Sequence, residues 1–164
     1  MKRFLLLLAL ATCAPLAMAT DDISKVNGSI HTDAGASYRD LDTVNGSIHL
    51  ASGTRARGVE TVNGSINAGD NVQARNMETV NGAIRGGRGL VLGGDVETVN
   101  GSIFIDHGSR IDGGVETVNG GIGLVGTEVG QNVETVNGDI TIGIGSHVKG
   151  AVKVNKSSFN LSLT

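Results

Sequence analysis

Hydrophobic and polar positions alternate in short stretches that recur along the chain at a nearly constant interval. The best-preserved stretch, Val-Glu-Thr-Val-Asn-Gly-Ser-Ile, occupies residues 59–66 and 96–103, and returns with one substitution at 115–122 and 133–140. Alternation of β-branched residues with polar ones is typical of strands, and no helical periodicity is present. The Val-Asn-Gly triplet has a degenerate eighth copy at 154–156. Its seven intact copies, 18 or 19 residues apart, begin at Val26, Val44, Val62, Val80, Val99, Val118 and Val136.

This period predicts an all-β fold, a single-stranded, three-sided parallel β-solenoid (β-helix). Eighteen residues divide into three sides of about six, so each repeat makes one turn of the chain, here called a rung. We expect about eight rungs, each adding roughly 4.8 Å to a rod. The alternative is a series of antiparallel hairpins, because Asn-Gly also favours two-residue hairpin turns. The constant period favours the solenoid, since a meander does not require identical residues at every eighteenth place.

Stacked rungs place equivalent residues above one another in columns. We expect the Asn side chains to form a hydrogen-bonded ladder, and the Gly after each Asn to supply the positive φ of a tight corner. A corner bulge absorbs the extra residue where the step is 19. The predicted Asn ladder comprises Asn45, Asn63, Asn81, Asn100, Asn119 and Asn137. Two columns are assigned to the interior: Ile30, Ile48, Ile66, Ile84, Ile103, Ile122 and Ile140, and Ile23, Leu41, Val59, Met77, Val96, Val115 and Val133.

The N-terminus has the three parts of a secretory signal peptide. Met1-Lys2-Arg3 is basic, an apolar run follows, and Ala17-Met18-Ala19 is a cleavage site of the Ala-x-Ala type. We therefore expect residues 1–19 to be removed and residues 20–164 to form one exported β-solenoid domain, with 153–164 as its C-terminal cap. The alternative is a lipoprotein anchored through Cys13, the only cysteine of the chain.

Composition limits the function further. Loss of Lys2 and Arg3 lowers the basic count from 13 to 11 against 16 acidic residues, a net charge of −5. That balance argues against a nucleic-acid partner. The chain has 26 Gly, no Trp and 2% aromatic residues, so the core is expected to be thin and built from Val, Ile, Leu and Ala. No run after the N-terminus is long enough for a transmembrane helix.

The repeated Glu-Thr-Val-Asn-Gly-Ser-Ile unit behind a signal peptide resembles a family of exported bacterial envelope proteins assigned as adhesins, whose function is unknown. The resemblance covers nearly all of residues 23–154. It implies a right-handed β-solenoid similar in plan to the bactofilins, which polymerise end to end. It carries no activity and no site residues over to this chain, and the signal peptide departs from the bactofilins, which act in the cytoplasm.

One acidic column is a candidate site for divalent cations. Neighbouring carboxylates about 4.8 Å apart repel, which raises their pKa or recruits cations, and Ca²⁺ prefers such oxygen ligands. The alternative is a solvated outer face whose charge discourages aggregation. The candidate metal ligands are Asp42, Glu60, Glu78, Glu97, Glu116 and Glu134.

The neighbouring Thr column suggests either structural hydrogen bonds or an ice-binding surface, and the structural interpretation needs fewer assumptions. His31 and His49 share a register and are expected to stack. Two histidines could bind a metal weakly, but no third ligand repeats beside them. No catalytic signature is present, so we expect a protein that is not an enzyme. The Thr column comprises Thr43, Thr61, Thr79, Thr98, Thr117 and Thr135.

The two ends of the rod bear on function because open strand edges recruit further chains. Asp21, Asp22 and Lys25 form a plausible polar N-terminal cap. Near the C-terminus, Phe159 and Leu161 either cover the end of the core or join rods head to tail. The sequence thus predicts a structural or interaction protein of the envelope or periplasm, adhesin-like or a scaffold, whose partners are itself or other envelope components. The alternative is a divalent-cation-binding module.

Overall fold

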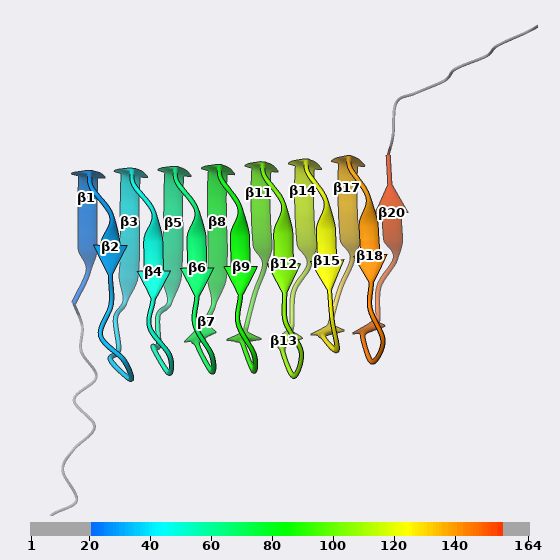
Figure 1. The fold of residues 1–164 in the computed structure, drawn as a ribbon, viewed down its shortest axis with the longest axis horizontal. Coiled ribbons are helices and arrows are strands. Elements are labelled where there is room, and N and C mark those ends of the chain that lie inside the picture. Colours follow the sequence, from blue (N-terminus) through cyan, green and yellow to red (C-terminus); the bar gives the residue numbers. More distant parts are fainter. Residues whose placement is uncertain (1–20, 156–164) are drawn as a thin grey trace, which may run out of the picture.

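The chain winds into a β-solenoid of about seven turns with three parallel sheets, one on each side (Figure 1). This computed structural model describes residues 21–155, which contain strands and no helix. Every strand pairs with its equivalent in the rung before or after it, and every pairing is parallel. The predicted solenoid is confirmed, and the hairpin alternative is wrong because no antiparallel pair occurs within these residues.

The first sheet has eight strands and contains the Glu-Thr-Val segment of each repeat. Its strands are β1 (Ile23–Asn27), β3 (Asp40–Asn45), β5 (Gly58–Asn63), β8 (Asn76–Asn81), β11 (Val96–Asn100), β14 (Val115–Asn119), β17 (Val133–Asn137) and β20 (Val152–Val154).

The other two sheets are built from shorter strands. The seven-stranded sheet contains β2 (Ile30–His31), β4 (Ile48–Leu50), β6 (Ile66–Ala68), β9 (Ile84–Gly86), β12 (Ile103–Ile105), β15 (Ile122–Leu124) and β18 (Ile140–Ile142). The five-stranded sheet contains β7 (Gln73–Ala74), β10 (Val91–Leu92), β13 (Arg110–Ile111), β16 (Glu128–Val129) and β19 (His147–Val148). Single bridges from Ser37 to Arg55 and from Arg55 to Gln73 extend this sheet toward the N-terminus.

Both predicted interior columns lie in the core. The Ile column is buried from Ile30 to Ile122, and its last member, Ile140, is half-buried. The second column is buried from Leu41 to Val133, and Ile23 is half-buried at its N-terminal end. Burial is complete inside the stack because each side chain is covered by its equivalents above and below.

The Asn ladder is also confirmed. The Nδ2 of Asn81 donates to the Oδ1 of Asn63 over 2.9 Å, and the Nδ2 of Asn100 donates to the Oδ1 of Asn81 over 2.8 Å. The same bond joins every neighbouring pair from Asn27 to Asn137. Each amide therefore points its nitrogen toward the N-terminal end of the rod.

The reason predicted for the glycines of this corner is wrong at all but one position. Only Gly28 has a positive φ, of 121°. A Cβ on Gly64 would instead lie 1.9 Å from the carbonyl oxygen of Gly46 in the preceding rung. Glycine is needed here because the stacked backbones approach too closely for any side chain. Positive φ belongs to the next corner, at a column comprising Gly35, Gly53, Asn71, Gly89, Gly108, Gly126 and Gly145.

The extra residue of the longer rungs enters the corner before the eight-stranded sheet. Gln73 pairs with Val91, 18 residues later, whereas Met77 pairs with Val96, 19 residues later. The insertion therefore lies between β10 and β11, as the predicted corner bulge requires.

The degenerate eighth copy at 154–156 was aligned one residue out of register. Val154 pairs with Thr135 rather than with Val136, and Lys153 pairs with Glu134. The long corner between β19 and β20 sets this register. Residues 153–155, predicted to begin the cap, accordingly continue the eight-stranded sheet.

Candidate functional site: the outer face of the eight-stranded sheet

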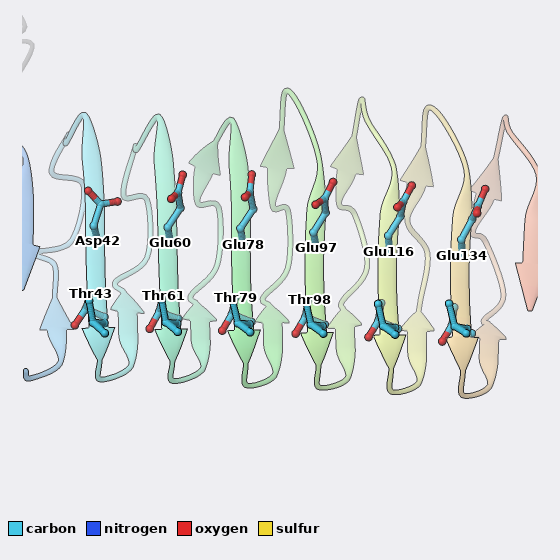
Figure 2. A pocket seen from close by; sticks show the side chains of 18 of the residues that line it. Asp42, Thr43, Glu60, Thr61, Glu78, Thr79, Glu97, Thr98, Glu116 and Glu134 are labelled. Carbon is cyan, nitrogen blue, oxygen red and sulfur yellow. The ribbon is translucent and has the colours of Figure 1, made fainter. Parts of the chain in front are cut away.

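The outer face of the eight-stranded sheet carries two parallel columns of side chains. Glu60 pairs with Glu78, and Glu97 with Glu116, so the carboxylates follow one another from rung to rung (Figure 2). Two residues further along each strand, a valine points to the same face and is about 40% exposed. Between the columns lies a groove of about 710 Å³, called here the acidic groove. Its two walls are Asp42, Glu60, Glu78, Glu97, Glu116 and Glu134, and Val26, Val44, Val62, Val80, Val99, Val118 and Val136.

The Thr column lies between these walls but points its hydroxyls inward. Thr61 and Thr98 are buried, and their Oγ1 atoms donate to the carbonyl oxygens of Gly46 and Gly82 over 2.9 and 3.0 Å. All six threonines make this bond to the preceding rung. The bond satisfies a carbonyl at the close-packed glycine corner, where an unpaired polar group is costly. The column is structural, and the ice-binding interpretation loses the exposed hydroxyls that it needs.

Burial raises the pKa of Glu60 and Glu97 above the ordinary value. Repulsion by Glu78, which lies between them in the column, is the next cause for both, and Asp42 and Glu116 add to it on either side. The raised pKa that the sequence predicted is therefore found at these two positions. Its leading cause is loss of solvent rather than mutual repulsion alone.

The ends of the acidic column are held differently from its middle. The Ser24 Oγ donates to Asp42 Oδ2 over 3.3 Å, and Lys153 Nζ contacts Glu134 Oε1 at 2.9 Å. Sequence reasoning missed Lys153 as the last member of this column because the eighth copy was out of register. Within residues 21–155 the four inner members, Glu60, Glu78, Glu97 and Glu116, make no ion pair.

The carboxylates lie side by side rather than around a common point. In Figure 2 the labelled acidic side chains point the same way along their strands. No three His, Cys, Asp or Glu side chains of the described segment form a group that could hold a metal ion. Ca²⁺ takes six to eight oxygen ligands. A cation on this face would therefore be shared between neighbouring rungs and completed by water.

Comparison with known protein families, with curated proteins and with solved structures finds no match. The function must therefore be argued from the chain itself. Residues 21–155 include no helix long and apolar enough to cross a membrane.

His31 and His49 stack as predicted, with ring centroids 4.7 Å apart and planes inclined by 2°. The lone pair of an imidazole nitrogen lies in the plane of its ring. Two parallel, stacked rings thus direct their lone pairs along separate parallel lines, which do not meet at a metal ion. Their geometry suits stacking better than chelation.

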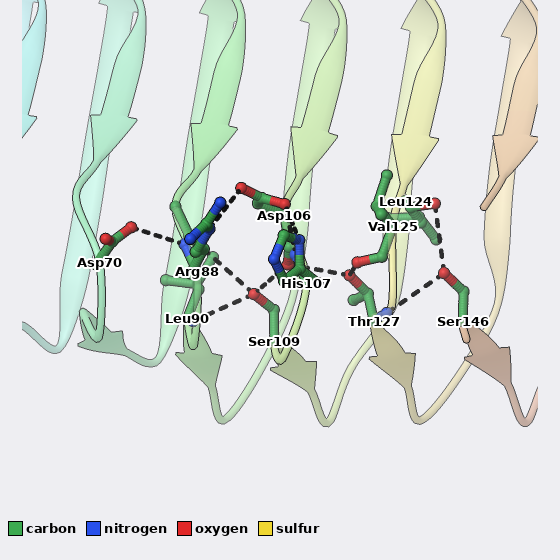
Figure 3. A network of polar contacts seen from close by, with 11 residues as sticks. Asp70, Arg88, Leu90, Asp106, His107, Ser109, Leu124, Val125, Thr127 and Ser146 are labelled. Carbon is green, nitrogen blue, oxygen red and sulfur yellow. Dashed lines mark hydrogen bonds and ion pairs between the residues drawn. The ribbon is translucent and has the colours of Figure 1, made fainter. Parts of the chain in front are cut away.

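Three residues of one corner have the types of a catalytic triad, which sequence reasoning did not single out (Figure 3). His107 Nδ1 is 2.5 Å from Asp106 Oδ1, and Ser109 is nearby. Ser109 is buried, however, and its Oγ donates to the carbonyl oxygen of Asp106 over 2.6 Å while accepting from the Leu90 N–H over 3.2 Å. A triad requires its hydroxyl to bond to the histidine and to reach a substrate. Here the hydroxyl instead fastens one rung to the next.

Asp106 is held in its ionised form. The backbone N–H of His107 lowers the pKa of this carboxyl, and the His107 ring and Arg88 add to the effect. Arg88 Nε is 3.6 Å from Asp106 Oδ2, and its backbone N–H donates to Asp70. These contacts link neighbouring rungs along the outside of the corner. Their evident effect is to hold the stack together.

The other predicted site lies outside the described residues. Phe159 and Leu161, assigned to self-association, fall within residues 156–164, and Cys13 and the cleavage site fall within residues 1–20. The described part of the C-terminal end does, however, bear on self-association, because it contains the last strand of each sheet.

Proposed function

We propose that this protein is an exported structural or interaction protein of the cell envelope, a rod that associates with further copies end to end. The observation that carries this proposal is the exposure of core positions in the last rung. Ile142 is 42% exposed, whereas its partner Leu124 in the preceding rung is 0% exposed. Val152 is 47% exposed, whereas Val133 is 0% exposed.

The open C-terminal end also has unpaired strand edges. β18, β19 and β20 each pair on one side only within the described residues. A second copy could continue all three sheets at once and cover the exposed core, which is favourable because each Å² of apolar surface buried contributes about 25 cal/mol. Ile144, 98% exposed, adds to the apolar surface at this end.

Charge favours the opposite end of another copy as the partner. Residues 140–155 contain Lys149 and Lys153 and no acidic residue. The first rung contains Asp21, Asp22 and Asp33. A head-to-tail contact brings these opposite charges together, whereas contact between two C-terminal ends would oppose lysine to lysine. Complementary charge sets the partner and its orientation more than the affinity.

Support for export comes from residues 1–19, which have the order of a signal peptide. A chain that carries no cysteine after Cys13 needs no disulfide in an oxidising compartment, because the interlocked columns supply its stability. A rigid rod with repeating outer columns suits an adhesin-like or scaffolding role, in which many identical surface groups are presented along one axis.

The test is light scattering of residues 20–164 across a concentration series, with electron microscopy of the same samples. We expect the mass to grow with concentration and filaments to appear. The Val152→Lys variant should stay monomeric, because it places a charge on the open core, and the matched Val91→Lys variant, changed at an exposed side position, should still associate. A wild-type chain that is monomeric throughout would mean that residues 156–164 cover the end, and the proposal would fail.

A second candidate function is divalent-cation binding in the acidic groove. It is favoured by the four inner glutamates, which have no cationic partner within residues 21–155. Millimolar Ca²⁺ should then raise the melting temperature, since a ligand of the folded state stabilises it. The Glu78→Gln/Glu97→Gln variant should lose the shift, and an unchanged wild-type melting temperature would end this candidate.

A further inference from the structure

The Asn ladder and the glycine corner together control a chemical reaction of the chain. Asn-Gly is the sequence most prone to spontaneous deamidation, because the glycine nitrogen meets no steric obstacle when it attacks the asparagine side chain. This chain contains seven such pairs, beginning at Asn27, Asn45, Asn63, Asn81, Asn100, Asn119 and Asn137. We propose that the stack protects six of them and leaves Asn137-Gly138 as the modification site.

The reaction needs both partners to be free. The backbone nitrogen of Gly138 would attack Cγ of Asn137, forming a nitrogen–carbon bond and breaking the bond from Cγ to Nδ2. The amide proton leaves with Nδ2 as ammonia, and a five-membered succinimide remains. Water then opens the ring to aspartate or isoaspartate. No oxidant or further reactant is required.

In the interior of the stack both partners are held. The Gly82 N–H donates to the backbone oxygen of Asn100 over 3.0 Å, and Asn81 Oδ1 accepts from Asn100 Nδ2. Attack would break the first bond and turn the amide out of the second. The same pair of bonds protects Asn27, Asn45, Asn63, Asn100 and Asn119, because each has an Asn in the following rung.

The direction of these bonds makes the two ends of the ladder unequal. Each glycine N–H and each amide oxygen takes its partner from the following rung. Asn27, at the N-terminal edge, is therefore as well protected as an inner residue, since Gly28 N–H reaches the oxygen of Asn45 over 2.8 Å. Only the C-terminal edge lacks the next asparagine.

At that edge the sequence itself ends the ladder. By the register of β20, Lys156 occupies the position after Asn137, so no asparagine amide follows. Within residues 21–155 no acceptor is present for the Gly138 N–H and no donor for Asn137 Oδ1. The folded chain thus directs deamidation to one of seven identical dipeptides.

The test is peptide mapping of the purified full-length protein after incubation at mildly alkaline pH. The sample is kept at a concentration where light scattering shows monomers, because a second copy on the C-terminal end could supply the missing acceptor. We expect isoaspartate at Asn137 to form about tenfold faster than at any other pair, since tenfold corresponds to about 1.4 kcal/mol, the scale of one net hydrogen bond. In denaturant all seven should react at similar rates.

Two controls keep the outcome decisive. The Asn137→Gln variant should lose the fast component and leave the slow ones unchanged. Asn27, also at an edge but with both bonds made, should react as slowly as Asn81. Equal rates at Asn27 and Asn137, or an Asn137 as slow as the inner residues, would overturn the proposal. This result does not depend on whether the rods associate, since the measured species is the monomer.

Discussion

The Oγ1 of Thr79 donates a 2.9 Å hydrogen bond to the carbonyl oxygen of Gly64, one rung earlier in the stack. Thr79 is 5% exposed, and the same bond recurs in every rung from Thr43 to Thr135. It couples the floor of the acidic groove to the corner that follows the Asn ladder. The side chains of the groove are therefore held by a rigid floor.

Replacing Thr79 by Val should lower the free energy of unfolding by about 1 kcal/mol. Valine keeps the shape but leaves the Gly64 carbonyl without its side-chain donor, and the cost of an unmade buried bond is about 1–3 kcal/mol, partly offset by the added methyl group. Val80→Thr, on the exposed side of the same strand, is the control and should change stability by less than about 0.5 kcal/mol. Urea unfolding measures both. Equal effects would mean that the hydroxyl bond contributes nothing.

Gly64→Ala should prevent the rod from stacking. The new Cβ would lie 1.9 Å from the Gly46 carbonyl oxygen, so the two rungs must separate there. We expect a loss of more than about 3 kcal/mol, beyond the ordinary range for single substitutions. Gly93→Ala is the matched control, because nothing lies within 4 Å of its added Cβ. Thermal unfolding followed by circular dichroism distinguishes them, and a Gly64→Ala protein as stable as Gly93→Ala would refute the close approach.

The Glu60→Gln/Glu97→Gln variant should be more stable than the wild type at neutral pH. Both carboxyls have a pKa raised in the folded state, so the wild type loses stability as the pH rises through their titration. Like charges on adjacent strands cost about 0.2–1 kcal/mol per pair, and salt reduces this. The advantage of the variant should shrink as the pH falls to the acidic range where the wild-type carboxyls are protonated.

Asp22→Asn provides the opposite sign in the same experiment. The Arg39 side chain lowers the pKa of Asp22 by hydrogen bonding, so its contribution to stability is present above the ordinary carboxyl pKa and is lost as the pH falls. The variant should therefore be less stable than the wild type at neutral pH and equal to it in acid. Melting curves across the pH range that showed the same trend for both variants would contradict this assignment.

The columns could be predicted from the sequence because a fixed period leaves no freedom in register. Once Ile66 lies above Ile48, the neighbouring strands place Asn63 above Asn45 and Glu60 above Asp42. The interior, the Asn ladder and the acidic column all follow from that one constraint. None of them requires knowledge of a particular side-chain conformation.

What could not be predicted depends on distances between backbones and on where residues are inserted. The need for glycine at Gly64 comes from the approach of another rung, which a local turn rule does not describe. Lys153 was missed as the partner of Glu134 because one corner residue shifts the register before β20. Asp106 and Ser109 meet in a corner that varies between rungs, so no column announced their contact.

A disulfide trap between ends tests self-association most directly. Ser24 in β1 and Lys153 in β20 occupy the acidic-column position at opposite ends of the rod. In a continuous head-to-tail stack their Cα atoms would lie about 4.8 Å apart, within the roughly 4.4–6.8 Å that a disulfide spans. The chain after residue 19 has no other cysteine. Oxidation of the Ser24→Cys/Lys153→Cys double variant should give a ladder of covalent oligomers on a non-reducing gel, while each single variant stops at dimers. A double variant that yields only monomers and dimers would contradict end-to-end assembly.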